Sequence, residues 1–346
     1  DFVRDIVHDL IASSGRRIET RLDLQQVNIP AEKAAPIALI VNHRSGTNAR
    51  DREALTRVVE GLGEARVRRY EFSSGDDIGE TVRRAVQDGA EAVLAAGGDG
   101  TAMAVAGSVL GTGRAFSHIP LGTFNYFARG IGLPEDPFEA ARAIANGVAK
   151  PIEVGTVNGR VFLNNASIGI YPQILRERET IYARYGRRRI MAHWSVARTF
   201  WKFQRPMTLQ ITADGRDFTC RAPLLFVFRS AYQLETFGLK GAQSISDDQF
   251  AVLIGRGKTR LDLFRTALRL VTRTAEIGRD YDFLAARQLT VTPHRRRRLL
   301  LAFDGDNFVE DVTHGFFPVR AQWHRFSKFE QKCSASAGQR PQTRPK

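Results

Sequence analysis

The segment Gly97-Gly-Asp-Gly-Thr101 constrains the fold of this chain more than any other feature of its sequence. It directly follows the buried run Ala92–Ala96, and we expect a helix of small residues after it, from about Ala102 to Leu110. Glycines at the point where a strand gives way to a helix let the backbone approach a ligand closely. The N–H groups of such a turn and of the following helix can bind phosphate oxygens. This pattern predicts a parallel strand–turn–helix unit with an anion site at its turn.

Two more polar turns follow expected strands in the same region. Ile37–Val41 ends at Asn42-His-Arg-Ser-Gly46, and Ile119–Leu121 ends at Gly122-Thr-Phe-Asn125. The carboxyl ends of parallel strands share one edge of a sheet, so we expect all three turns to meet at a nucleotide site. The expected strands alternate with helices at 50–62, 78–88 and 137–146, which favours an α/β layer. The chain has no GxxxxGK[ST] segment, and its first strand–helix turn lacks GxGxxG, so both commoner phosphate loops are excluded.

The second half of the chain has a β-rich pattern. Asn158-Gly159 and Asp214-Gly215 predict hairpin turns, and two longer helices are expected at 187–203 and 260–275. Strands are expected at 154–157, 161–165, 208–213, 217–222, 224–229, 250–254 and 289–292. We therefore predict a lead-in at 1–36, an α/β nucleotide-binding domain at 37–150, a mainly antiparallel β-sandwich domain at 151–327 and a disordered basic tail at 328–346.

Net charge separates the two halves. The chain carries +14 in all, and residues 151–346 hold 33 basic and 17 acidic side chains, a net +16. An excess of this kind predicts an anionic partner. No stacking-aromatic motif accompanies the charges, so we expect an anionic membrane surface and not nucleic acid. Cys220 and Cys333 form no CxxC pair, which argues against a disulfide framework and a thiolate zinc site and fits a reducing cytosol.

For two amphipathic helices and two histidines we expect structural roles in preference to functional ones. The apolar stripe Leu261, Phe264, Leu268 and Val271 is expected to face the core, as is the Trp-containing stripe of 187–203. His43 and His118 have no metal-ligand spacing, so we expect structural or surface roles for them.

Several of these motifs, taken together, resemble the catalytic domain of the diacylglycerol kinase family, which includes bacterial lipid kinases and sphingosine kinases. The resemblance spans about 37–325. It is carried by Asn42-x-x-Ser-Gly46, Gly97–Thr101, Pro120–Pro134, Asn158–Asn165, Ser246–Asp248 and Asp304-Gly-Asp306. It implies an α/β domain similar to that of NAD kinases, joined to a β-sandwich-like domain with the active site between them. It also implies ATP-dependent phosphorylation of a lipid hydroxyl, diacylglycerol-like by default, with Mg²⁺.

The resemblance also implies roles for individual residues. Nucleotide contacts fall on Asn42, Ser45, Gly46, Gly97, Gly98, Asp99, Gly100, Thr101, Ala102, Met103, Thr123 and Asn125. Asp306 stands where the family has the glutamate of Asp-Gly-Glu, a proton acceptor, and Asp99 is the other candidate for that role. Asp248 matches a family Mg²⁺ ligand, with the carbonyl oxygens of Ala251 and Leu253 as its partners.

Four positions depart from the family pattern and keep alternatives open. Asp306 replaces a glutamate, Tyr126 stands where many members have an aspartate, and Gln249 replaces a glycine. Glu71 lies near a position where some relatives have a nucleotide-contacting threonine. The leading expectation is a cytoplasmic lipid kinase, peripherally associated with the inner face of the membrane. The alternatives are a soluble NAD kinase, which uses a similar Gly-Gly-Asp-Gly turn, and a catalytically silent lipid- or nucleotide-binding protein.

Overall fold

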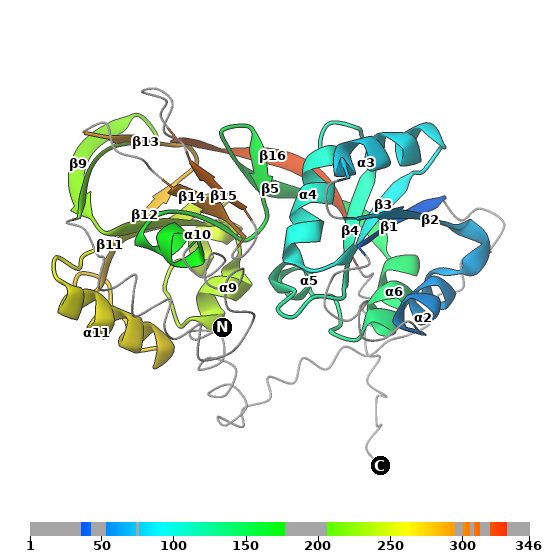
Figure 1. Cartoon of the computed structure of the whole chain (residues 1–346), viewed down its shortest axis with the longest axis horizontal. Helices are drawn as coiled ribbons and strands as arrows, with labels where there is room; N and C mark the ends of the chain where they lie inside the picture. The colour runs from blue at the N-terminus through cyan, green and yellow to red at the C-terminus, as the bar shows by residue number, and fades with distance from the viewer. Residues whose placement is uncertain are drawn as a thin grey trace, which may run out of the picture.

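The fold is taken from a computed structural model of the whole chain, which forms two lobes side by side (Figure 1). The structure describes residues 36–42, 53–73, 76–176, 206–294, 300–304, 308–311 and 319–330. Several sequence predictions lie outside these ranges: the lead-in up to residue 35, Ser45 and Gly46, the helix at 187–203, Asp306 and residues 331–346 of the predicted tail. The predicted start of that tail at 328 is wrong, because residues 328–330 are the end of a strand.

The N-terminal lobe contains a parallel sheet in the order β2-β1-β3-β4. Its strands are β1 (Ile37–Asn42), β2 (Val67–Phe72), β3 (Ala92–Gly97) and β4 (Ala115–Pro120). Its helices are α2 (Glu53–Leu62), the short 3₁₀ turn η2 (Glu64–Arg66), α3 (Ile78–Gln87), α4 (Asp99–Val109), α5 (Tyr126–Gly130) and α6 (Pro137–Ala145).

Helices cover both faces of this sheet. Alternate residues of β1 point to opposite faces: Ile40 lies in one apolar cluster with α3 and α4, and Leu39 in another with α2 and α6. A strand that is buried on both faces has an uninterrupted apolar sequence, which is why Ile37–Val41 and Ala92–Ala96 predict these strands correctly.

The C-terminal lobe contains an antiparallel sheet of six strands, in the order β12-β11-β10-β7-β14-β15. These strands are β7 (Asn165–Gly169), β10 (Leu224–Phe228), β11 (Phe250–Gly255), β12 (Tyr281–Ala286), β14 (Leu300–Phe303) and β15 (Phe308–Asp311). A helical segment at 170–176 follows β7. One face of the sheet packs against an apolar cluster shared with α9 (Ala231–Thr236), α10 (Ala242–Ser246) and α11 (Arg260–Val271).

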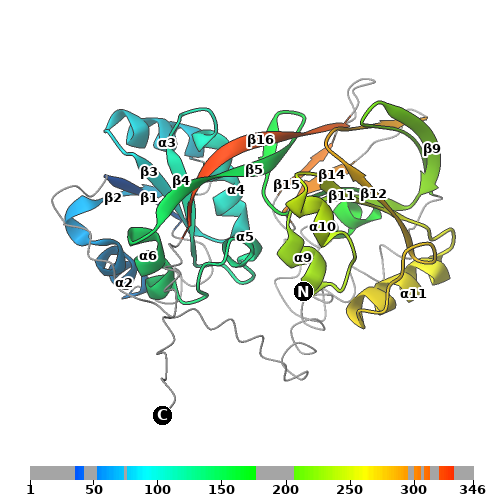
Figure 2. The same cartoon turned by 180° about the vertical axis from the view of Figure 1, so that it is seen from behind.

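Two long strands join the lobes. β5 (Val148–Val157) pairs antiparallel with β16 (Val319–Glu330) along its whole length, and both pass from one lobe to the other (Figure 2). β16 meets β4 near one end and β13 (Leu289–Pro293) near the other. With β6 (Arg160–Phe162), β8 (Met207–Ala213) and β9 (Arg216–Ala222), they complete a sheet of ten strands that runs through both lobes.

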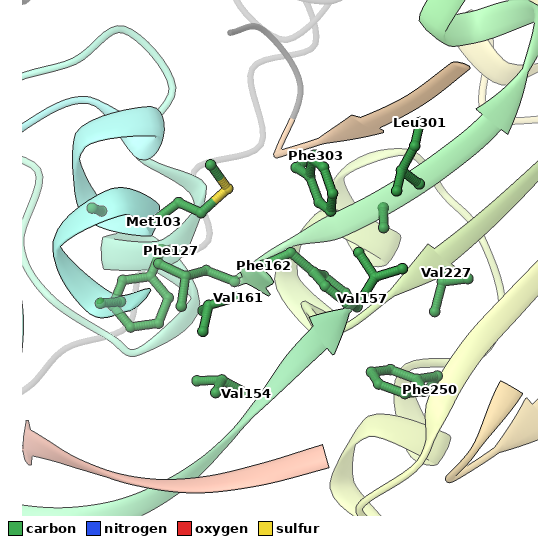
Figure 3. Packing of buried hydrophobic residues seen from close by; sticks show 14 of the residues in the cluster. Met103, Phe127, Val154, Val157, Val161, Phe162, Val227, Phe250, Leu301 and Phe303 are labelled. Carbon is green, nitrogen blue, oxygen red and sulfur yellow. The ribbon is translucent and has the colours of Figure 1, made fainter. Parts of the chain in front are cut away.

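The hydrophobic core is also continuous between the lobes. Met103 of α4 and Phe127 of α5 belong to the same buried cluster as Val157 and Phe250 of the C-terminal lobe (Figure 3). Phe162 is fully buried within this cluster and stacks on Phe250 with ring centroids 5.7 Å apart. Shared apolar packing of this kind couples the lobes mechanically.

The two hairpin turns form as the sequence predicts. Asn158 and Gly159 have φ of 49° and 80° between β5 and β6, and Asp214 and Gly215 have φ of 47° and 80° between β8 and β9. Both central residues of a type I′ turn need positive φ, which Asn, Asp and Gly tolerate best. No described helix is long and apolar enough to span a membrane.

Candidate functional site

The turn after β3 is shorter than the sequence suggested. Helix α4 begins at Asp99 rather than near Ala102, with Gly98 as its N-cap. Glycine has no side chain with which to cap the helix, and the N-terminus of α4 has no side-chain cap. The first N–H groups of a helix point out along its axis with a partial positive charge. The Gly97–Thr101 segment therefore contains a helix terminus of the kind that can bind an anion.

Two glycine turns meet in front of this helix. A Cβ placed on Gly122 would overlap the Cα of Gly98 and lie 2.7 Å from Oδ1 of Asn125. Asn125 adopts a left-handed backbone conformation, and its amide exchanges hydrogen bonds with the N–H and C=O of Gly122 at 2.9 and 3.1 Å. The turns after β3 and β4 are thus in backbone contact. The predicted nucleotide contact Thr123 is exposed in the same turn.

The side chain of Asn42 reaches this turn from the end of β1. Its Nδ2 donates to Oγ1 of Thr101 at 3.2 Å. Thr101 in turn packs against Gly97, where a Cβ would lie only 2.6 Å from its Oγ1. Asn42 thereby links β1 to the first turn of α4, as expected if the strand ends converge.

Asp99 forms the link between the lobes at this point. Its Oδ2 accepts from the N–H of Tyr126 at 3.1 Å, and its Oδ1 accepts from the N–H of Phe127 at 3.0 Å. These bonds hold the N-terminus of α5. Oδ1 also accepts from Nδ2 of Asn164, which lies between β6 and β7, at 3.3 Å.

Asp304 continues the same hydrogen-bonded chain on the other side of Asn164. Its carboxylate accepts from the backbone N–H groups of Leu163, Asn164 and Asn165 at 2.8, 2.6 and 2.9 Å. Burial raises the pKa of Asp304 to about 7, and the nearby negative charge of Asp99 also raises it. The three N–H donors have the opposite effect and lower the pKa. Two carboxylates thus lie within electrostatic reach of each other, bridged by Asn164.

His118 lies directly behind the turn and is completely buried. Its Nε2 is 2.9 Å from the carbonyl oxygen of Gly97. Burial lowers the pKa of His118, whereas the charge of Asp99 and the Gly97 carbonyl oppose that shift. A neutral ring therefore donates from Nε2 and supports the end of β3, so the structure gives His118 a structural role.

Aromatic rings border the site on its outer side. Tyr126 stacks on Phe124 with centroids 5.2 Å apart and lies 6.4 Å from both Tyr232 and Phe237. Arg129 joins this group through a hydrogen bond from Nη1 to the Tyr232 hydroxyl at 3.3 Å. Tyr126 thus puts an aromatic ring where many family members have a carboxylate.

The residues predicted to bind Mg²⁺ lie in β11 and in the turn between α10 and β11. Asp248 is exposed, with φ of 56°, while Ala251 and Leu253 are buried in β11 between β10 and β12. In a central strand the carbonyls point toward the neighbouring strands. Burial lowers the pKa of Arg229 to about 10, and the negative charges of Asp248 and Glu153 oppose that shift. A guanidinium near Asp248 already provides a positive charge there, so these residues fit a resident cation poorly.

The structure brings together Asn42, Gly97–Thr101 and Asn125, while Ala102 and Met103 are buried one turn further along α4. The roles assigned to them, and to Ser45, Gly46 and Asp306, stay predictions. No group of three or more His, Cys, Asp or Glu side chains suited to a metal occurs in the described part of the chain. Asn164 and Asp304 were missed as site residues, although both lie in motifs that carried the family resemblance.

Comparison with known proteins finds sequence relatives for part of this chain. The family model of the diacylglycerol kinase catalytic domain matches residues 36–157. A diacylglycerol kinase of Bacillus subtilis is 30% identical over 191 residues, which cover 54% of this chain and 61% of that protein. A protein of Chromohalobacter salexigens named "Probable lipid kinase YegS-like" is 36% identical over 149 residues, 42% of this chain and 47% of that protein. The chain thus matches less than two thirds of the length of either relative.

A solved structure shows the same fold. The crystal structure of a diacylglycerol kinase from Bacillus anthracis superposes with a TM-score of 0.62 at 18% sequence identity, covering 86% of this chain and 97% of the other. The likeness confirms the predicted pairing of an α/β domain with an antiparallel β domain. The sequence comparisons add that residues 36–157 of this chain match the diacylglycerol kinase catalytic-domain family, and that the two bacterial relatives are similar to about half of the chain.

Proposed function

We propose that this protein is a lipid kinase that transfers the γ-phosphoryl group of ATP to a hydroxyl of a diacylglycerol-like lipid, at the junction of its two lobes. One observation carries the proposal. The uncapped N-terminus of α4 lies beside two carboxylates, Asp99 and Asp304, which Asn164 bridges between the lobes. Phosphoryl transfer needs a cradle for phosphate, exact positioning and a nearby proton acceptor more than it needs covalent chemistry.

The nucleotide is proposed to bind with its phosphates at the first turn of α4. The N–H groups after Gly98 would face the phosphate oxygens. Gly98 and Gly122 are partly exposed and place no side chain over either turn. Asn42 supports the turn through its hydrogen bond to Thr101. It can therefore contribute to nucleotide binding without touching the nucleotide. Thr123, exposed beside Gly122, is the side chain best placed to add a hydroxyl contact.

Asp306 is the proposed proton acceptor, and Asp99 is proposed to position the site. The oxygens of Asp99 already accept three hydrogen bonds that hold α5 and Asn164. Removing its charge would release those donors. Asp306 follows two residues after Asp304, which is fixed at the Leu163–Asn165 turn by three N–H groups. We therefore propose that Asp306 acts next to this anchored position.

ATP is proposed to act as its magnesium complex, in which the ion neutralises charge on the phosphates. Because Asp248, Ala251 and Leu253 fit a resident cation poorly, the proposed reaction does not depend on a cation bound there. The acceptor lipid is proposed to approach from an anionic membrane surface, toward the basic C-terminal half of the chain.

One assay separates this proposal from its rivals. The full chain is incubated with γ-labelled ATP and diacylglycerol in mixed vesicles, with NAD offered as acceptor in a parallel reaction. Label in the lipid supports the lipid kinase. Label in NADP would instead identify a soluble NAD kinase, and ATP binding without transfer to either acceptor would identify a silent binding protein.

A further inference from the structure

Exposed apolar side chains are concentrated in one part of the C-terminal lobe. Among the residues that the structure describes, five large hydrophobic side chains are exposed, and four of them lie between 261 and 277. Leu261, Phe264 and Leu268 of α11 are 66%, 57% and 55% exposed. This result overturns the expectation that their stripe faces the core. A cluster of exposed apolar side chains on one helix typically marks an interaction site.

The three residues form one face of α11. Their spacing of three and four residues puts them on the same side of a helix. Leu263, the fully buried member of the helix, lies on the opposite side, and Leu270 packs beside it against the cluster under α9 and α10. α11 therefore binds its own lobe through a narrow apolar face and presents a second one outward. We define Leu261, Phe264 and Leu268 as the outer face of α11.

Polar contacts fix the orientation of this helix. Asp280, which is buried, accepts from Nη1 of Arg269 at 2.6 Å and from Nε of Arg279 at 3.0 Å. At the other end, Thr259 and Asp262 form a capping box. With both ends of α11 held, the outer face cannot turn inward without breaking a buried ion pair, which is costly.

The surroundings of the outer face are basic. Residues 256–282 contain seven Lys or Arg side chains and four acidic ones, a net excess of three basic groups. Arg256, Arg269 and Arg279 form ion pairs with Asp282 and Asp280. Arg265 is exposed and lies four residues after Leu261 and three before Leu268, so it borders the apolar face. Lys258 is exposed just before the helix. An apolar stripe bordered by basic side chains complements a membrane surface that contains anionic lipids.

We propose that the outer face of α11 docks on the surface of an anionic bilayer, with Leu261, Phe264 and Leu268 in the headgroup–acyl boundary and Lys258 and Arg265 against lipid headgroups. This inference rests on the proposed lipid kinase activity only for the purpose of docking, which is to bring the candidate site to the acceptor lipid. α11 packs on the same face of the six-stranded sheet as α9, and α9 contacts the site through Tyr232 and Tyr126. Docking by this face therefore holds the bilayer on the side of the lobe where α9 borders the site.

Vesicle co-sedimentation without ATP or diacylglycerol tests docking independently of any kinase activity. Phosphatidylcholine vesicles with and without phosphatidylglycerol are compared for wild type and for Leu261→Gln/Phe264→Gln/Leu268→Gln. We expect wild type to bind the anionic vesicles and the triple variant to bind roughly tenfold or more weakly, because three side chains lose apolar burial. An unchanged melting temperature shows that the exposed substitutions leave the fold intact.

A charge variant provides the second, independent reading. Lys258→Gln/Arg265→Gln is expected to weaken binding to anionic vesicles severalfold at low salt and to matter less as ionic strength rises. Arg69→Gln/Arg83→Gln removes the same charge from exposed positions of the other lobe and should bind like wild type. Equal binding by wild type and both α11 variants overturns the proposal. So does self-association of wild type that the triple variant abolishes, since a second copy then covers the face.

The two proposals fail in different ways. If docking is right and the kinase proposal wrong, wild type binds vesicles but labels no lipid. If the reverse holds, the triple variant labels diacylglycerol in vesicles as fast as wild type. With both right, the triple variant loses activity on vesicles and keeps it on a short-chain, water-soluble diacylglycerol.

Discussion

Four polar residues define the candidate site at the scale of single side chains: Asn164 and His118 are buried, and Asp99 and Asp304 are partly buried. Asp99 and Asp304 are held by backbone N–H groups and bridged by Asn164, while His118 supports the turn from behind. The sequence identified Asp99, because it stands inside a glycine turn. It did not identify Asp304 as a site residue, because its partners lie 139 to 141 residues earlier in the chain. A local motif shows that a residue is unusual but not what it touches.

The buried His118 predicts an acid-dependent loss of stability. Because burial lowers the pKa of His118 below its ordinary 6.5, the unfolded chain binds this proton at a pH where the folded chain does not. The contribution of neutral His118 to the free energy of unfolding is therefore present above pH 6.5 and is lost as the pH falls below 6.5. His118→Gln keeps a donor for Gly97 and removes the titration. Below pH 6.5 the free energy of unfolding of this variant should rise relative to that of wild type, by up to about 1.4 kcal/mol for each pH unit. Urea titrations at several pH values measure this, and parallel pH curves for the two proteins would refute it.

At the scale of elements, the strands of the first half were the most predictable part of the fold. Buried parallel strands have continuous apolar sequences, so β1 and β3 could be recognised locally. β16 could not, because it has a largely polar sequence and pairs with β5, more than 160 residues earlier. The outer face of α11 shows a second limit of prediction from sequence. Periodicity reveals an apolar stripe, but only the packing of the whole lobe decides whether that stripe is covered.

The contact between the turns after β3 and β4 makes a prediction at this scale. Gly122→Ala introduces a Cβ that overlaps Gly98, so the turns must separate. We expect a loss of about 1–3 kcal/mol in stability and roughly tenfold weaker ATP binding. Gly107→Ala is the matched control, because its Cβ would lie 3.7 Å from Val161 in ordinary contact. This helical alanine should leave ATP binding unchanged and stabilise by about 0.5–1 kcal/mol. Calorimetry measures both quantities, and equal ATP affinity in the two variants would contradict the proposed cradle.

At the scale of the whole molecule, the two lobes are structurally continuous. A ten-stranded sheet and one apolar cluster pass through both, with Phe162 at their meeting point. The sequence predicted two domains, and the shared core between them depends on contacts that no local pattern encodes.

This shared core predicts cooperative unfolding. Phe162→Ala should lower the free energy of unfolding by about 3–5 kcal/mol and should reduce amide-exchange protection equally in β3 and in β11, which belong to different lobes. Phe218→Ala, at a half-buried position on β9, is expected to cost less. If β3 kept its protection while β11 lost it, the lobes would be independent folding units.

The most direct test of the account is the rate of phosphoryl transfer from ATP to diacylglycerol in Asp306→Asn, compared with Asp99→Asn and wild type. The account predicts that Asp306→Asn lowers kcat by roughly 10²–10⁴ with an unchanged melting temperature and ATP affinity, as the loss of a proton acceptor should. Asp99→Asn should lower the melting temperature as well, since it releases α5 and Asn164. A wild-type chain that transfers no phosphate to lipid, or an Asp306→Asn variant as active as wild type, would contradict it.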